Sequence, residues 1–136
     1  MIVVDSSVLV MYFSREPGWR RARELLLEPV VTLDLAVKEV ANALWKKVLK
    51  GELPLEAAAR VVEDLASGRA LPLYRQEPLV VRSLEIAARL RVTVYDALFI
   101  ALAERLHASL ATADERQAHA ARRLGVETLL LAGAPG

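Results

Sequence analysis

Short apolar runs alternate with longer amphipathic segments along the chain. The apolar runs are rich in valine and leucine, which is typical of buried strands; they cover residues 2–4, 30–33, 71–74, 109–112 and 126–131. Helices are predicted between them, over residues 19–27, 35–50, 54–67, 78–90, 96–107 and 115–124, with a short helix or turn over residues 8–13. Prolines and glycines punctuate these segments: Pro29 stops one helix and Gly51 closes another.

This alternation of strands and helices predicts an α/β fold with a parallel sheet of about five strands, covered by helices on both faces. Pro72 places the run over residues 71–74 at an edge of that sheet. The 136 residues are enough for one domain with a core and too few for two comfortable ones. We therefore expect a single domain over residues 1–136, with a loose tail over residues 132–136.

Acidic residues stand where predicted strands end or helices begin. Asp5 follows the first strand, Asp114 follows the fourth, and Asp96 opens the helix that precedes the fourth strand. That helix advances about 16 Å at about 1.5 Å per residue, and the following strand returns about as far. Asp96 and Asp114 are thus predicted to meet at the carboxyl edge of the sheet, where α/β proteins bind ligands.

Glu39 lies in the helix that follows the second strand, beside the apolar stripe that contains Val40 and Leu44. Asn42, one turn further on, is expected to hydrogen-bond to its carboxylate. Each of the three aspartates also has a simpler explanation as a helix cap, and Asp114 with Gln117 fits a capping box. Four acids converging on one edge instead favour a site for a hard divalent cation such as Mg²⁺ or Mn²⁺.

Composition excludes several other classes of protein. There is no cysteine, and the net charge of +1 with a pI of about 8.1 lacks the strongly basic balance of a protein held on nucleic acid by charge alone. No signal peptide or membrane span is expected, so a cytoplasmic location is predicted. Ser6 and Ser7 lack a glycine-rich elbow and a histidine base, and no glycine-rich phosphate loop occurs.

Three blocks of sequence resemble the PIN-domain ribonucleases of the VapC type, the toxins of toxin–antitoxin pairs. The blocks are Val3-Val4-Asp5-Ser6-Ser7-Val8, Glu39-Val40-Ala41-Asn42-Ala43-Leu44, and Tyr95-Asp96-Ala97-Leu98 together with Leu110-Ala111-Thr112-Ala113-Asp114. The resemblance spans nearly the whole chain and implies a PIN-like fold, metal-dependent RNA cleavage, a homodimer and a VapB-like antitoxin. Where many members have a proline or a small residue near position 34, this chain has Asp34.

The family's acidic residues fall on Asp5, Glu39, Asp96 and Asp114, which the resemblance makes the catalytic and metal-binding set. Ser7 and Thr112 match positions where the family often has a hydroxyl near the metal, and Asn42 is expected to support Glu39. Lys46, Lys47 and Lys50, on the helix that carries Glu39, are either a solvated face or contacts to an RNA backbone.

Two other functions stay open at this point. A structure-specific DNA nuclease of related fold would use the same acids, and a catalytically silent protein-binding module would retain them without chemistry. Trp19 and Trp45, two tryptophans in a chain with 5% aromatic residues, hint at a protein partner. The sequence does not separate a toxin from a housekeeping RNA-processing enzyme.

Overall fold

The computed structural model describes residues 1–131. The strands are β1 (Ile2–Val4), β2 (Val30–Leu33), β3 (Leu73–Tyr74), β4 (Ser109–Thr112) and β5 (Thr128–Leu130). The helices are α1 (Ser6–Phe13), α2 (Trp19–Leu26), α3 (Leu35–Leu49), α4 (Leu55–Ala66), the 3₁₀ turn η1 (Glu77–Leu79), α5 (Val80–Leu90), α6 (Val94–Leu106) and α7 (Glu115–Arg123). The tail expected over residues 132–136 lies outside the described residues.

All five strands are parallel, in the order β3-β2-β1-β4-β5. Val3 of β1 is in register with Val31 of β2 on one side and Leu110 of β4 on the other. The chain runs outward from β1 through β2 to β3 and then returns to β4 on the opposite side of β1. The predicted α/β fold is confirmed, and the switch in strand order lies between β1 and β4, where ligands bind in such sheets.

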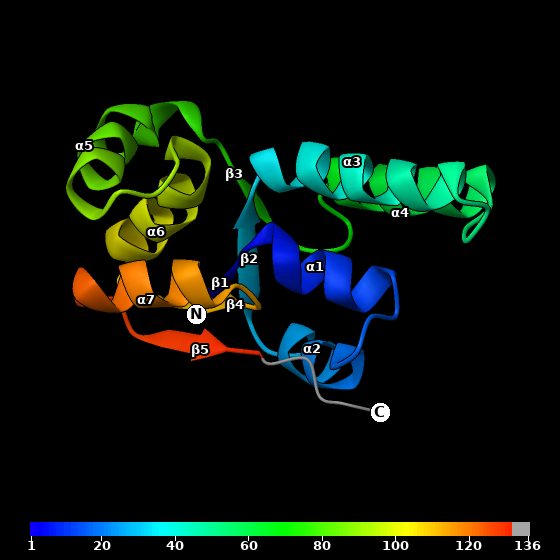
Figure 1. Cartoon of the computed structure of the whole chain (residues 1–136), viewed down its shortest axis with the longest axis horizontal. Coiled ribbons are helices and arrows are strands. Elements are labelled where there is room, and N and C mark those ends of the chain that lie inside the picture. Colours follow the sequence, from blue (N-terminus) through cyan, green and yellow to red (C-terminus); the bar gives the residue numbers. More distant parts are fainter. Residues whose placement is uncertain (132–136) are drawn as a thin grey trace.

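Two layers of helices cover the sheet. Figure 1 shows α1, α2, α3 and α4 on one side of it and α5, α6 and α7 on the other. This division follows from right-handed crossovers, because connections that run in opposite directions along a parallel sheet fall on opposite faces. Every helix that follows a strand thus begins at the carboxyl edge of the sheet.

Helix α6 is buried nearly all round, since every residue from Ala97 to Ala103 is buried. It packs against β1, β2 and β4 on one side and against α5 on the other. A bidentate ion pair joins these helices at the surface, with Arg82 Nε and Nη2 each 2.8 Å from a carboxylate oxygen of Glu104. Within residues 1–131, no helix combines the length and the apolar character needed to span a bilayer.

The helix over residues 96–107 begins earlier than predicted, at Val94. Thr93 caps it, because its hydroxyl accepts a hydrogen bond from the backbone N–H of Asp96 at 3.1 Å. The simpler explanation of Asp96 as a helix cap therefore fails, because Asp96 lies inside the first turn. Asp34, the residue that departs from the family pattern, accepts a hydrogen bond from Gln76 N at 3.2 Å. Helix α3 begins at Leu35, as predicted.

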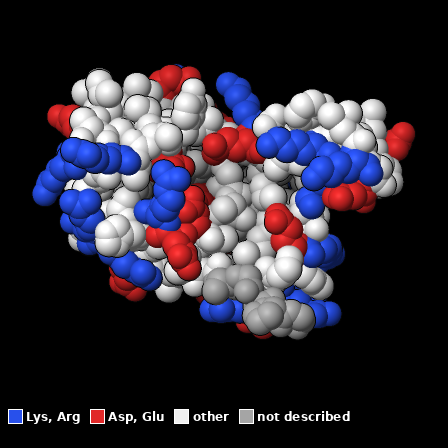
Figure 2. All heavy atoms as spheres, in the orientation of Figure 1, with Lys and Arg blue, Asp and Glu red and all other residues white. Residues whose placement is uncertain are grey.

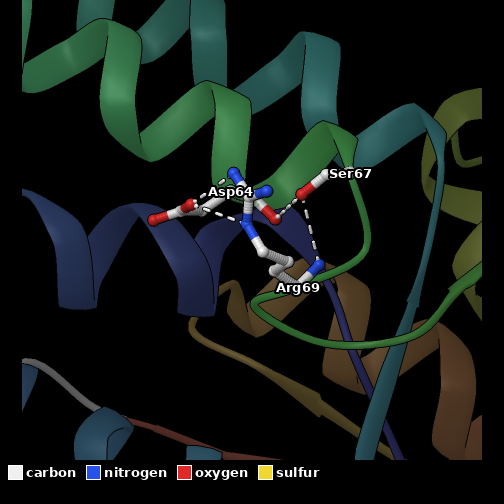
Figure 3. A network of polar contacts seen from close by, with 3 residues as sticks. All are labelled: Asp64, Ser67 and Arg69. Carbon is white, nitrogen blue, oxygen red and sulfur yellow. Dashed lines mark hydrogen bonds and ion pairs between the residues drawn. The ribbon is translucent and has the colours of Figure 1, made fainter.

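The edge position of β3 is confirmed by the strand order, although only Leu73 and Tyr74 belong to the strand. A network of hydrogen bonds at the surface holds the turn that connects α4 to β3 (Figure 3). Arg69 donates from Nη2 to Asp64 Oδ1 at 3.1 Å, and Ser67 Oγ donates to the Asp64 carbonyl at 3.2 Å. Gly68 in this turn has a φ of 77°, a conformation that glycine adopts without strain.

Candidate active site

Asp5 stands at the carboxyl end of the central strand β1 and is almost fully buried, at 5% exposed. Its Oδ1 accepts hydrogen bonds from the Ser7 hydroxyl at 2.5 Å and from Val8 N at 3.3 Å. Its Oδ2 accepts from the Thr112 hydroxyl at 2.5 Å and from the Gln117 amide at 3.4 Å. The carboxylate therefore caps α1 and is also held by residues of β4 and α7.

Burial raises the pKa of Asp5 to about 6, and the hydrogen bonds from Ser7, Thr112 and Val8 offset only part of this rise. The free-energy cost of removing the charged carboxylate of Asp5 from water exceeds the stabilisation that the hydrogen-bond donors give it. No lysine or arginine within residues 1–131 forms an ion pair with this carboxylate. Asp5 is thus a buried acid without a protein counter-ion, which is a feature of functional sites.

Glu39 is half-buried on α3 and accepts a hydrogen bond from the Ser6 hydroxyl at 2.6 Å. Burial raises its pKa, the Ser6 hydroxyl lowers it, and the negative charge of Asp96 raises it. The expected hydrogen bond from Asn42 does not form, since Asn42 is exposed and Ser6 occupies that role. Ser6 directly follows Asp5 and is the first residue of α1, so the start of α1 contacts α3 beside Asp5.

Asp96 is half-buried in the first turn of α6. Burial raises its pKa first, and the negative charge of Asp114 raises it further; the Thr93 hydroxyl and the positive charge of Arg116 lower it. Asp114 is exposed and caps α7, accepting from Arg116 N at 2.9 Å and Gln117 N at 3.4 Å. The fold thus brings Glu39, Asp96 and Asp114 within electrostatic range along one edge.

The hydroxyls of Ser7 and Thr112 connect β1 to β4 at this edge. Ala113 N donates to Ser7 Oγ at 2.8 Å, and Asp114 N donates to Thr112 Oγ1 at 3.0 Å. The side chain of Gln117 does not complete the predicted capping box with Asp114. It donates instead to Asp5. The capping box is therefore wrong in its second hydrogen bond, the one between the Gln117 side chain and the backbone N–H of Asp114.

Ser6, Thr93 and Gln117 are site residues whose roles the sequence did not predict. Gln117 is 1% exposed, and its Oε1 is buried without a hydrogen-bond partner among the described residues. A buried glutamine with a free acceptor is costly unless something else occupies its neighbourhood. The one signal in the sequence was a glutamine at the third position of a helix that otherwise consists of charged residues, histidine and alanine.

Comparison with known families identifies this arrangement. A model of the PIN domain matches residues 2–123. The chain belongs to the PIN-domain family.

Curated relatives cover nearly the whole of this PIN domain. Ribonuclease VapC3 of Pyrobaculum aerophilum is 33% identical over 120 residues, which cover 86% of the chain and 92% of that protein. Exonuclease VapC9 of the same organism is 32% identical over 131 residues, which cover 95% of the chain and 92% of that protein. The resemblance to VapC-type PIN domains drawn from the three sequence blocks is confirmed.

Solved structures share the fold of this PIN domain. The crystal structure of PAE2754 from Pyrobaculum aerophilum has a TM-score of 0.70 at 26% identity, over 93% of this chain and 82% of that one. The crystal structure of FitAcB from Neisseria gonorrhoeae has a TM-score of 0.66 at 20% identity, over 95% and 96%. The five-stranded sheet with helices on both faces is thus a known arrangement.

The oxygen atoms at this edge of the PIN domain suit a hard divalent cation. Asp5, Glu39 and Asp96 each have a raised pKa, and for Glu39 and Asp96 a neighbouring acid contributes to the rise. Within residues 1–131, no three histidine, aspartate or glutamate side chains form a ready-made metal-binding group. The donor types fit Mg²⁺ or Mn²⁺, and the assignment of individual ligands stays a prediction.

A groove of about 530 Å³ extends from Glu39 along α3. Its lining contains Asn42 and the lysines predicted as RNA contacts, Lys46, Lys47 and Lys50. Lys38 also lines the groove and was not among the predicted contacts. Figure 2 shows acidic atoms around a hollow in the middle of the face and basic atoms running along α3 beside it.

Proposed function

We propose that this PIN domain is a metal-dependent endoribonuclease that hydrolyses RNA phosphodiesters internally. The observation that carries the proposal is the connected edge in which Asp5 is held by Ser7 of α1 and Thr112 of β4. Asp96 and Asp114 lie in electrostatic contact at the same edge. The name of the relative Ribonuclease VapC3 supports RNA as the substrate.

Asp5, Asp96 and Asp114 would hold Mg²⁺ or Mn²⁺, with Glu39 sharing in binding or orienting the attacking water. When bound, the ion supplies stabilisation of the negative charge that builds on the phosphate oxygens and lowers the pKa of water. The hydroxyls of Ser7 and Thr112 keep Asp5 in place. The raised pKa of Glu39 makes it a better proton acceptor than an exposed glutamate, so it suits a general base.

The test is cleavage of single-stranded RNA by the purified protein with Mg²⁺ or Mn²⁺ and with EDTA. Flapped DNA assayed beside it separates this activity from that of a structure-specific DNA nuclease. Because one relative is named an exonuclease, circular RNA is the decisive substrate: an endonuclease opens it, and an exonuclease leaves it intact. If neither nucleic acid is cleaved and no metal binds at millimolar concentration, the protein is a silent binding module.

We further propose that this PIN domain acts as a toxin in the cytoplasm, as a homodimer neutralised by a VapB-like antitoxin. Trp45 and Leu55 are 53% and 65% exposed and line an apolar groove of about 500 Å³ between α3 and α4, which suits an amphipathic segment of an antitoxin. Val81, Leu84 and Tyr95 are also more than half exposed and form a candidate dimer surface. Light scattering of the purified chain tests the dimer.

The neighbouring open reading frame provides the test of the antitoxin. Co-expression of its product should yield a stable complex in which RNA cleavage is inhibited, and Trp45→Ala should weaken that complex. Growth arrest on expression of the chain alone, relieved by the same product, would distinguish a toxin from a housekeeping RNA-processing enzyme. Proteolysis that yields no stable fragment shorter than residues 1–131 would support a single domain.

A further inference from the structure

Three of the four lysines of the chain lie on α3, the fourth, Lys50, is its C-cap, and all four line the groove that begins at Glu39. The remaining cations are arginines, and none of them lines this groove. Lys38, Lys46 and Lys50 are exposed, and no carboxylate of residues 1–131 lies within ion-pair distance of them. Three positive charges thus face the groove with no partner in the part of the chain that the structure describes.

The spacing of these side chains along α3 is regular. Lys38, Asn42, Lys46 and Lys50 follow one another at every fourth residue, which advances about 6 Å per step and about 18 Å in all. Such steps are comparable with the distance between successive phosphates in an extended single strand. Lys47 also lines the groove but pairs with Glu52 at 3.7 Å, so it is the least available of the four.

The lining residues of the groove favour contact with the RNA backbone over contact with bases. No aromatic side chain is among its lining residues, whereas proteins that hold bases of single strands stack them on aromatic rings. Asn42 is the one neutral polar side chain of the row, placed to hydrogen-bond a sugar hydroxyl or a phosphate oxygen. Glu16 also lines the groove, and its negative charge repels an anion and limits the affinity.

We propose that this groove binds a stretch of about four nucleotides of single-stranded RNA next to the bond that is cleaved, since the row is about 18 Å long. Lys38, Lys46 and Lys50 contact phosphates of this stretch without regard to base sequence. The inference rests on the proposed function, since the groove begins at a carboxylate of the candidate active site. The inference specifies where the bound RNA strand runs beyond the candidate active site. Sequence preference is then determined elsewhere on the protein.

The test measures binding in EDTA, so that cleavage does not interfere. Fluorescein-labelled oligoribonucleotides of about 12 nucleotides, one of uridines and one of adenosines, are titrated with the protein by anisotropy. The variant Lys38→Gln/Lys46→Gln/Lys50→Gln is compared with Arg60→Gln/Arg89→Gln/Arg105→Gln. The control removes three exposed arginines that neither line the groove nor form an ion pair within residues 1–131, so both variants lose the same charge.

We expect the lysine variant to bind both oligoribonucleotides more weakly than the control does. Each lost phosphate contact lowers the slope of log K against log salt by about 0.7, so the slope should fall by about 2 between about 50 and 200 mM salt. Glu16→Gln should have the opposite effect and tighten binding. Equal losses in the lysine variant and the control would overturn the inference, because net charge alone would then explain binding.

Cleavage of the same RNA by the wild-type protein with Mg²⁺ is measured in parallel. If the wild type cleaves and the lysine variant binds as tightly as the control, the groove assignment fails and the proposed function stands. If lysine-dependent binding is seen without cleavage, the proposed function fails alone. An oligoglutamate is titrated as well. If it binds more tightly than RNA and the lysine variant loses this binding, the ligand of the groove is an acidic protein segment and the inference is overturned.

Discussion

The hydroxyl of Thr112 donates a hydrogen bond to Oδ2 of Asp5 across 107 positions of sequence. Both residues are buried, and they stand at the ends of the adjacent parallel strands β4 and β1. This contact joins the two halves of the PIN domain at the switch in strand order. It also orients the carboxylate that stands at the centre of the candidate active site.

Replacing Thr112 by valine keeps the shape of the side chain and removes the donor to Asp5 and the acceptor for Asp114 N. We expect the free energy of unfolding to fall by about 1–3 kcal/mol, because buried polar groups are left unpaired. Urea denaturation measures this change. Thr128→Val is the matched control on β5, where one hydrogen bond to Val126 O is lost from a half-buried residue; an equal loss there would contradict the special role of Thr112.

Asp96→Asn preserves the size of the side chain and weakens it as a ligand for a cation. We expect RNA cleavage with Mg²⁺ to fall at least about 100-fold, equivalent to about 2.7 kcal/mol of transition-state stabilisation. The melting temperature without a divalent cation should stay the same or rise, because Thr93 and not Asp96 caps α6 and because burial and the charge of Asp114, which raise the pKa of Asp96, disfavour its charged form. Asp64→Asn, at an exposed site on α4, serves as the control. A variant that cleaves as fast as the wild type would exclude Asp96 from the site.

The burial of Asp5 predicts a stability that depends on pH when no divalent cation is present. Its pKa is about 6 in the folded protein, against an ordinary value of 3.8 for an aspartate, so the folded state binds the proton more tightly than the unfolded state does. The stabilisation is complete below pH 3.8 and is lost as the pH rises through 6, on the order of 3 kcal/mol.

Asp5→Asn removes this titration. Urea midpoints measured in EDTA should therefore show the variant gaining on the wild type as the pH rises from 4 to 8. A difference in stability that stays constant over this range would show that Asp5 is not the group responsible. Glu28→Gln, at an exposed position after α2, provides a control with the same change in charge.

Addition of Mg²⁺ or Mn²⁺ should stabilise the folded protein. Burial and, to a smaller extent, repulsion from a neighbouring acid raise the pKa of Glu39 and Asp96, and a bound cation offsets both effects. At a tenfold excess over the dissociation constant the gain is about 1.4 kcal/mol, seen as a higher melting temperature. Asp96→Asn should reduce the gain, whereas Asp64→Asn should not. A melting temperature that is indifferent to both ions would contradict the metal site.

Much of the fold was predictable because its signals are local. The apolar runs at residues 2–4, 30–33 and 109–112 are short and flanked by turn residues, and all three are strands in the structure. Helix α6 was harder to delimit: it starts at Val94, because the cap is Thr93. A threonine and an aspartate three residues apart both fit a helix start, and only the backbone geometry distinguishes them.

The sequence by itself determined the alternation of strands and helices, and hence that Asp5, Asp96 and Asp114 stand at the same edge of a parallel sheet. The periodicity of apolar residues contains this information, because burial of one face dictates the secondary structure. Tertiary structure alone decided that Ser6 binds Glu39, that Gln117 turns to Asp5, and that four lysines share one groove. These contacts join segments distant in sequence, and their partners are selected by packing and by the satisfaction of buried polar groups, which no local pattern encodes.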